Sequence, residues 1–142
     1  MKYQLHFSLS ECENTDYWVP LMRYFFSISD TIEIHCWNDE EMVVQETKSI
    51  LYGSYKTTME NGLTIFNGSK TIDVVNHLLF NNVDTEGKIK WFTIFLNKNR
   101  TTIFQSEHWG MEFFAPNVNE KEIEFIKSIM PTETNYNQYI DN

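Results

Sequence analysis

The stretch KIKWFTIFLN, residues 88–97, constrains the fold most, because it is apolar on both faces when it is extended. Successive side chains of a strand point to opposite sides, so a strand that is apolar throughout must be covered on both. One face carries Ile89, Trp91 and Phe95, and the other carries Phe92, Ile94 and Leu96. The stretch predicts a central strand, and the segments TTIFQSEHW and MEFFA after it predict a three-stranded meander.

Other segments predict further strands and helices. Residues 2–9 and 31–37 alternate between polar and apolar, which is the period of a strand with one buried face. Asn61-Gly62, between YKTTME and LTIFN, is typical of a two-residue hairpin turn, because both positions require positive φ. Apolar residues at helical spacing predict four helices, over about 17–27, 38–53, 72–79 and 119–130.

Local residues indicate where these helices begin. Pro20 is tolerated only in the first turn of the first helix, because proline has no backbone N–H to donate. Asn38 with Glu41, and Asn119 with Glu122, have the spacing of a capping box. We therefore expect helix starts at both asparagines.

These elements predict a single α+β domain over residues 1–131, with a mainly antiparallel sheet of about five to seven strands packed with about four helices. Residues 132–142 are predicted to form a polar tail, which Tyr136, Tyr139 and Ile140 could hold to the body. No apolar run is long enough to span a bilayer, and the first residues lack the apolar core of a signal peptide. We expect a cytoplasmic protein whose two thiols, Cys12 and Cys36, are reduced, with a disulfide between them as the alternative if the protein is secreted. Cys36 shares its face with Ile32 and Ile34 and is expected to be a buried structural thiol.

The charge is uneven along the chain, whose net charge is −9. Residues 1–46 hold nine acidic and two basic side chains, residues 47–100 four and seven, and residues 101–142 seven and two. Such a chain repels nucleic acid and anionic membranes and attracts a basic protein. Two alternatives remain: the acidity serves only solubility, or the lysines around Trp91 and Phe92 form a nucleic-acid site.

No spacing of ligands predicts a metal or cofactor site. The four histidines are scattered, and no Cys-x-x-Cys, His-Glu-x-x-His or phosphate-binding glycine motif occurs. In an extended segment Ser106 and His108 share one face and Glu107 the other, so Glu107 is not placed to orient His108 as in a catalytic triad. We expect no catalytic residue.

Two clusters combine acidic and aromatic side chains. With Ile32, Ile34 and Cys36 turned inward, Glu33, His35 and Trp37 face outward and lead into Asp39, Glu40 and Glu41. The second cluster holds Glu107, Trp109 and Glu112. An exposed tryptophan rimmed by acids is typical of an anchor in a charge-complementary interface, so these nine residues are the predicted partner-binding site. The alternative is that a helix covers this face and Trp37 belongs to the core.

The stretches IEIHCWNDEE and SEHWGMEFFAPNVNEKEIEFIKSIM, an acidic-aromatic strand and a strand leading into a capped helix, resemble small acidic immunity proteins of bacterial polymorphic and contact-dependent toxin systems. The resemblance implies a non-enzyme that binds a basic toxin domain, often a nuclease, and blocks its active site. Two other readings stay open: a small enzyme or ligand-binding domain with a pocket beside the sheet, and a regulatory subunit of a larger assembly.

Overall fold

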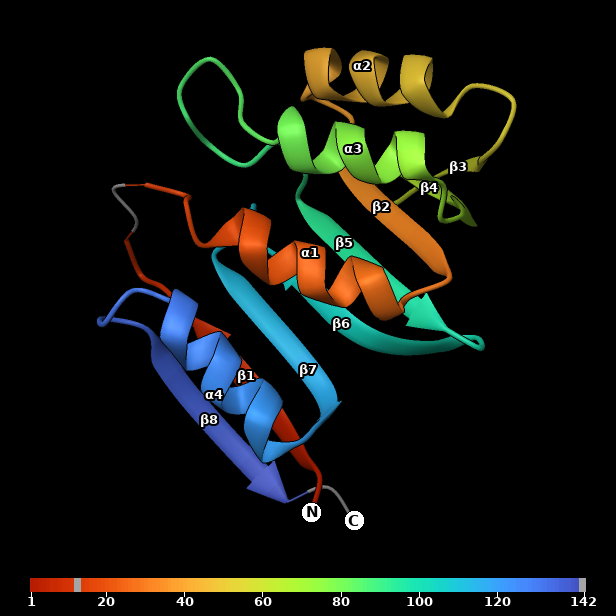
Figure 1. Cartoon of the computed structure of the whole chain (residues 1–142). Helices are drawn as coiled ribbons and strands as arrows, with labels where there is room; N and C mark the ends of the chain where they lie inside the picture. The colour runs from red at the N-terminus through yellow and green to blue at the C-terminus, as the bar shows by residue number, and fades with distance from the viewer. Residues whose placement is uncertain (12–13, 141–142) are drawn as a thin grey trace.

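An antiparallel sheet runs through the whole molecule in the computed structural model, which describes residues 1–11 and 14–140. In these residues it has eight strands in the order β3-β4-β2-β5-β6-β7-β1-β8 (Figure 1). The strands are β1 (Tyr3–Ser8), β2 (Thr31–Trp37), β3 (Lys56–Glu60), β4 (Leu63–Ser69), β5 (Thr93–Lys98), β6 (Thr101–Glu107), β7 (Glu112–Val118) and β8 (Asn135–Ile140). The α+β class is confirmed, and the expected five to seven strands fall short by one.

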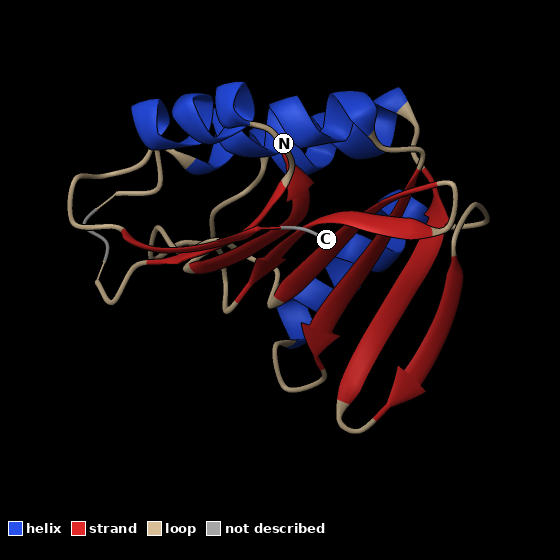
Figure 2. Cartoon of the chain, turned by 90° about the horizontal axis from the view of Figure 1, so that it is seen from below, coloured by secondary structure: helices blue, strands red, loops and turns tan. Residues whose placement is uncertain are grey.

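Four helices lie against this sheet in the described residues: α1 (Trp18–Ile28), α2 (Glu41–Leu51), α3 (Ile72–Phe80) and α4 (Glu120–Ile129). Figure 1 shows α1 across the middle strands and α4 beside β1 and β8, and Figure 2 shows how strongly the sheet twists. The Phe25 ring of α1 stacks on Phe104 of β6 with centroids 4.0 Å apart. No helix in the described part of the chain is long and apolar enough to cross a membrane.

The predicted central strand is confirmed, because β5 pairs with β2 on one side and β6 on the other. Its extended part is shorter than expected, and the residues before Thr93 lead into it as a loop. Trp91 in this loop is buried beside Trp18, with ring centroids 6.0 Å apart, and its Nε1 donates a hydrogen bond to Thr47 Oγ1. The meander β5-β6-β7 is also as predicted.

The local predictions were met at all but one position. Asn61 and Gly62 form the β3–β4 turn with φ of 52° and 81°, Pro20 lies in the first turn of α1, and Asn119 and Glu122 make the capping box of α4. The predicted capping box of Asn38 and Glu41 is wrong. Helix α2 begins at Glu41 without a side-chain cap, and Asn38 Oδ1 accepts a hydrogen bond from Thr64 Oγ1 instead.

The C-terminal segment differs from the predicted polar tail, because Asn135–Ile140 form β8 along β1. Tyr136 lies opposite Phe7, and their rings stack at 5.9 Å. An edge strand needs only one neighbour and can keep polar side chains in solvent, so its sequence need not alternate. The structural domain thus includes this strand.

Candidate protein-binding site

The turn between β6 and β7 has an unusual backbone. His108, Trp109 and Gly110 all have positive φ, of 50°, 54° and 76°. Side chains of this size rarely adopt the left-handed region, and such strain persists only where the surroundings impose it. The Trp109 N–H donates to Phe92 O and the Met111 N–H donates to Glu107 O, at 3.1 Å each. The turn therefore holds Trp109 against the segment that precedes β5.

Three aromatic rings from distant parts of the chain meet at this end of the sheet. Phe92 lies between Trp37 at the end of β2, with centroids 5.0 Å apart, and Trp109, at 4.8 Å. The rings are tilted by 52° and 64°, and all three side chains are half-buried. With Asp39, Glu40 and His108 they line a hollow of about 530 Å³, here called the aromatic hollow.

Carboxylates stand at the rim of the aromatic hollow. Glu40 Oε1 accepts a 2.9 Å hydrogen bond from Trp109 Nε1, which ties the β6–β7 turn to the residue before α2. Asp39 and Glu41 on either side are exposed. In the described residues no Lys, Arg or His forms an ion pair with these three carboxylates. The rim is therefore a negatively charged surface beside two half-buried indoles.

A second cavity of about 620 Å³ adjoins the aromatic hollow and shares Glu40, His108 and Trp109 with it. Its charged lining is mostly acidic: Glu11, Glu40, Asp84 and Glu86, with Lys88 as the one lysine among the described lining residues. The Asp84 side chain accepts hydrogen bonds from the backbone N–H groups of Glu86 and Lys88, which shapes this loop. We call this cavity the acidic pocket.

Histidine–glutamate pairs occupy the face of the sheet opposite the buried side chains of β1 and β2. Glu112 bridges two imidazoles, with Oε2 at 2.7 Å from His6 Nε2 and Oε1 at 2.6 Å from His108 Nδ1. The bond with His6 is the main cause that lowers the pKa of Glu112, with His108 adding to it. Burial, followed by the charge of Glu112, raises the pKa of Glu107. Glu33 and His35 make a similar pair at 2.7 Å.

The predicted site residues thus fall into four places. Trp37, Asp39, Glu40 and Trp109 come together around the aromatic hollow. Glu107 and Glu112 flank the β6–β7 turn, Glu33 and His35 lie further along β2, and Glu41 opens α2. Trp37 packs mainly over Gly62 and Phe92 and is only half-buried. Trp37 is therefore not a fully buried core residue.

Sequence reasoning named Glu40 but missed Phe92, His108 and the other acids of the acidic pocket, Glu11, Asp84 and Glu86. Phe92 was assigned to a strand face, although it lies just before β5 and supports both tryptophans. Asp84 and Glu86 were visible as acids in a polar segment, but nothing local placed them near Trp109. Ser106 is buried and accepts a hydrogen bond from Trp18 Nε1, which makes it part of the core.

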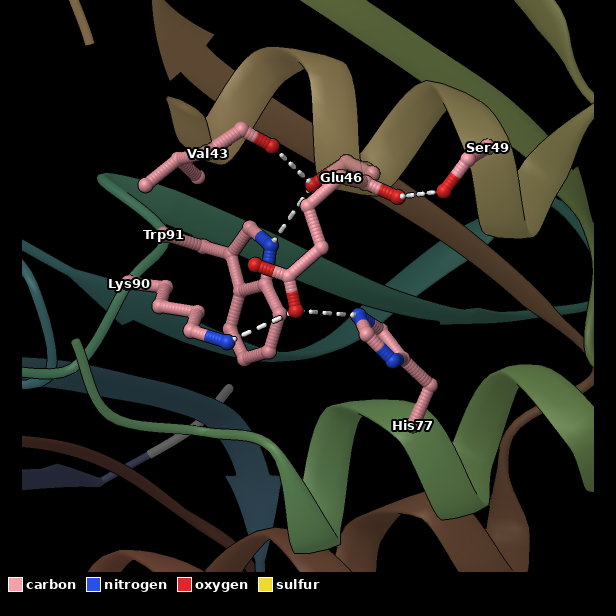
Figure 3. Close-up of polar contacts among 7 residues, drawn as sticks. Val43, Glu46, Ser49, His77, Lys90 and Trp91 are labelled. Carbon is pink, nitrogen blue, oxygen red and sulfur yellow. Dashed lines mark hydrogen bonds and ion pairs between the residues drawn. The ribbon is translucent and has the colours of Figure 1, made fainter. Parts of the chain in front are cut away.

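A separate polar cluster braces α2 and α3 (Figure 3). Glu46 Oε1 of α2 accepts a 2.8 Å hydrogen bond from Lys90 Nζ and lies 3.7 Å from His77 Nε2 of α3. His77 Nε2 is buried and has no hydrogen-bond partner among the described residues. Burial is the main cause that lowers the pKa of His77 from 6.5, with Glu46 opposing and Lys90 assisting.

No group of three or more His, Cys, Asp or Glu in the described residues is arranged to hold a metal ion. Cys36 is buried and its thiol is free, whereas Cys12 lies outside the described residues. No family model, curated protein or solved structure matches the chain.

Proposed function

We propose that this chain is a non-catalytic binding protein that takes a basic protein partner at the aromatic hollow and the acidic pocket, and that it serves as a cytoplasmic immunity protein against a toxin domain. One observation carries the proposal. Trp37 and Trp109, 72 positions apart in the sequence, lie around one hollow with the carboxylates of Asp39 and Glu40.

The composition of this surface suits protein recognition. Partly exposed tryptophans supply most of the binding energy in many interfaces, and unpaired carboxylates at the rim accelerate encounter with a basic partner. Both are present here, and the left-handed turn at His108 and Trp109 holds one indole in place before any partner arrives. Such preorganisation lowers the entropy that binding would cost.

As an immunity protein, the chain would act by blocking the substrate groove of the toxin. A toxin that acts on nucleic acid needs a basic substrate groove, and an acidic protein seated there would exclude the substrate. The chain would need no catalytic residue or cofactor for this role. The resemblance of its acidic-aromatic segments to immunity proteins supports this choice among the binding functions.

The first test is affinity capture from the native cell lysate at low salt, with identification of the retained protein by mass spectrometry. We expect one basic protein at near-equal stoichiometry, released when the salt is raised. The rate at which this protein associates with the double variant Asp39→Lys/Glu41→Lys is then measured. We expect the rate to be at least several-fold lower than with the wild type at low salt.

The matched control is Glu124→Lys/Glu133→Lys, which changes the net charge by the same amount at two exposed positions outside both cavities. It should slow association much less. Failure to retain any protein contradicts a binding function, and equal rates for the two double variants contradict the proposed surface.

A second candidate function is a small enzyme or ligand-binding domain. It is favoured by His108, which lines the acidic pocket while its Nδ1 lies 2.6 Å from Glu112 Oε1, since a carboxylate can orient an imidazole for proton transfer. A metabolite screen by thermal shift tests it. A compound that stabilises the wild type but not His108→Ala would support this candidate, and the absence of any such compound would count against it.

A further inference from the structure

We propose that the aromatic hollow binds the guanidinium group of an arginine side chain that the partner inserts. The inference rests on the proposed function, because it names the chemical group that the acidic-aromatic surface would take. It names a specific occupant for the aromatic hollow, and binding of that group can be tested without the partner.

Three aromatic side chains line the hollow: Trp37, Phe92 and Trp109. The Phe92 ring centroid lies 5.0 Å from that of Trp37 and 4.8 Å from that of Trp109, and both indoles are half-buried. A cation is attracted to an aromatic face within about 6 Å of the ring centroid, and tryptophan is the strongest of the three aromatic side chains. A cation in the hollow is therefore within reach of an indole ring, since Trp37 and Trp109 both line it.

The carboxylates provide the countercharge. Asp39 is exposed and Glu40 half-buried, both line the hollow, and in the described residues neither is paired with a protein cation. Glu40 Oε1 is held by Trp109 Nε1, which fixes the orientation of the carboxylate while the group keeps further lone pairs. The hollow thus combines aromatic faces with two acceptors that carry net negative charge.

Arginine fits this combination better than lysine. The guanidinium is planar, so it can stack on an indole while its N–H groups point sideways to a carboxylate in a two-bond arrangement. The lysine ammonium is compact and strongly hydrated, and it would lose more hydration on leaving water for the same rings. The geometry therefore points to arginine among the side chains of a basic partner.

The test is a titration followed by NMR of the four indole N–H signals, with N-acetyl-L-arginine amide as the probe. Trp18 and Trp91 are buried and donate to Ser106 and Thr47, so their signals report whether the fold is intact. The signals of Trp37 and Trp109 are assigned with Trp37→Phe and Trp109→Phe. N-acetyl-L-lysine amide and the neutral N-acetyl-L-citrulline amide are titrated in parallel.

We expect saturable shifts of the Trp37 and Trp109 signals with an apparent dissociation constant of roughly 1 to 20 mM, the weak range of a single side chain. The lysine amide should bind at least threefold more weakly, and the citrulline amide should give no saturable shift. Asp39→Asn should weaken binding of the arginine amide severalfold, whereas Glu124→Gln on α4 should leave it unchanged.

Absence of saturable shifts with the arginine amide overturns the proposal, and so does equal binding of the lysine amide. A ten-residue polylysine separates this failure from failure of the proposed function. Shifts of Trp37 and Trp109 with polylysine alone would remove the arginine site and keep a surface for basic partners. No response to any of these probes, together with an empty capture experiment, would remove both proposals.

Discussion

Trp109 Nε1 donates a 2.9 Å hydrogen bond to Oε1 of Glu40, although the two residues are 69 positions apart. The bond joins the strained β6–β7 turn to the residue that precedes α2. Because the same glutamate lines both the aromatic hollow and the acidic pocket, this contact holds the wall between them in place.

Removal of this acceptor should destabilise the fold modestly. We expect Glu40→Ala to lower the free energy of unfolding by about 1 kcal/mol, and Glu40→Gln by less, because an amide oxygen still accepts. Asp39→Ala is the control, since Asp39 is exposed and makes no side-chain hydrogen bond in the described residues, and it should change stability by less than about 0.5 kcal/mol. Urea unfolding measures all three. Equal losses for the two alanine variants would mean that the bond contributes nothing.

Gly110 lets the backbone of the β6–β7 turn lie directly against the core. A Cβ at this position would lie 2.9 Å from both Ile89 Cγ1 and Trp18 Cδ1, and φ is +76°. Trp18 is fully buried and cannot move away. Gly110→Ala should therefore cost about 2 to 4 kcal/mol, as the sum of left-handed strain and overpacking.

Gly53 provides the matched control for this substitution. Its φ is +78°, close to that of Gly110, but a Cβ there would meet no atom within 4 Å. Gly53→Ala should cost only the backbone strain, about 1 to 2 kcal/mol. Chemical denaturation of the two variants compares them directly, and equal costs would show that the contacts with Trp18 and Ile89 relax freely.

Local patterns predicted the parts of the fold that local physics decides. Alternation in residues 31–37 located β2 and its buried face, and Asn61-Gly62 located the β3–β4 turn. The cap at Asn119 was found because its partner Glu122 follows at the required spacing. The same spacing failed at Asn38, where Thr64 of β4 occupies the asparagine side chain. Because Thr64 is distant in the sequence and is brought near by the pairing of β4 with β2, the residues around Asn38 do not reveal this hydrogen bond.

The remaining features depend on pairings between distant segments. Strand β8 was missed because its mostly polar, exposed residues gain order from backbone pairing with β1. The individual tryptophans and acids of the site were named, but their convergence was not, because Trp37, Phe92 and Trp109 belong to three separate segments. Phe92 looked like part of a buried strand, and only its position ahead of Thr93 turns it toward the tryptophans.

The thiol of Cys36 should be almost unreactive in the folded protein. Burial, partly offset by the hydrogen bond with Thr47, raises its pKa from 9.0 to about 12, which lowers the thiolate fraction roughly a thousandfold. The measurement is iodoacetamide labelling at pH 8 in a Cys12→Ser background, followed by intact mass. We expect no labelling over hours in buffer and complete labelling in urea. Labelling in buffer at the rate of a free thiol would contradict the buried position.

His77 should make stability depend on pH. Burial lowers its pKa below 6.5, so the unfolded chain takes up a proton at higher pH than the folded chain. The unfolded state then binds more protons as pH falls below about 6.5, and the free energy of unfolding declines over that range. The neighbours of His77 Nε2 do not supply a compensating hydrogen bond, because Glu46 Oε1 lies 3.7 Å away and is bonded to Lys90 (Figure 3).

The comparison of wild type with His77→Gln isolates this contribution from the other histidines. Urea unfolding at pH 7.5 and pH 5.5 should show a larger loss of stability in the wild type than in the variant, since glutamine has no proton to gain. NMR titration of the His77 ring should give a pKa below 6.5, which measures the same shift directly. Parallel loss of stability in the two proteins would mean that the attraction of Glu46 cancels the effect of burial, and a ring that titrates above 6.5 would mean that it outweighs burial.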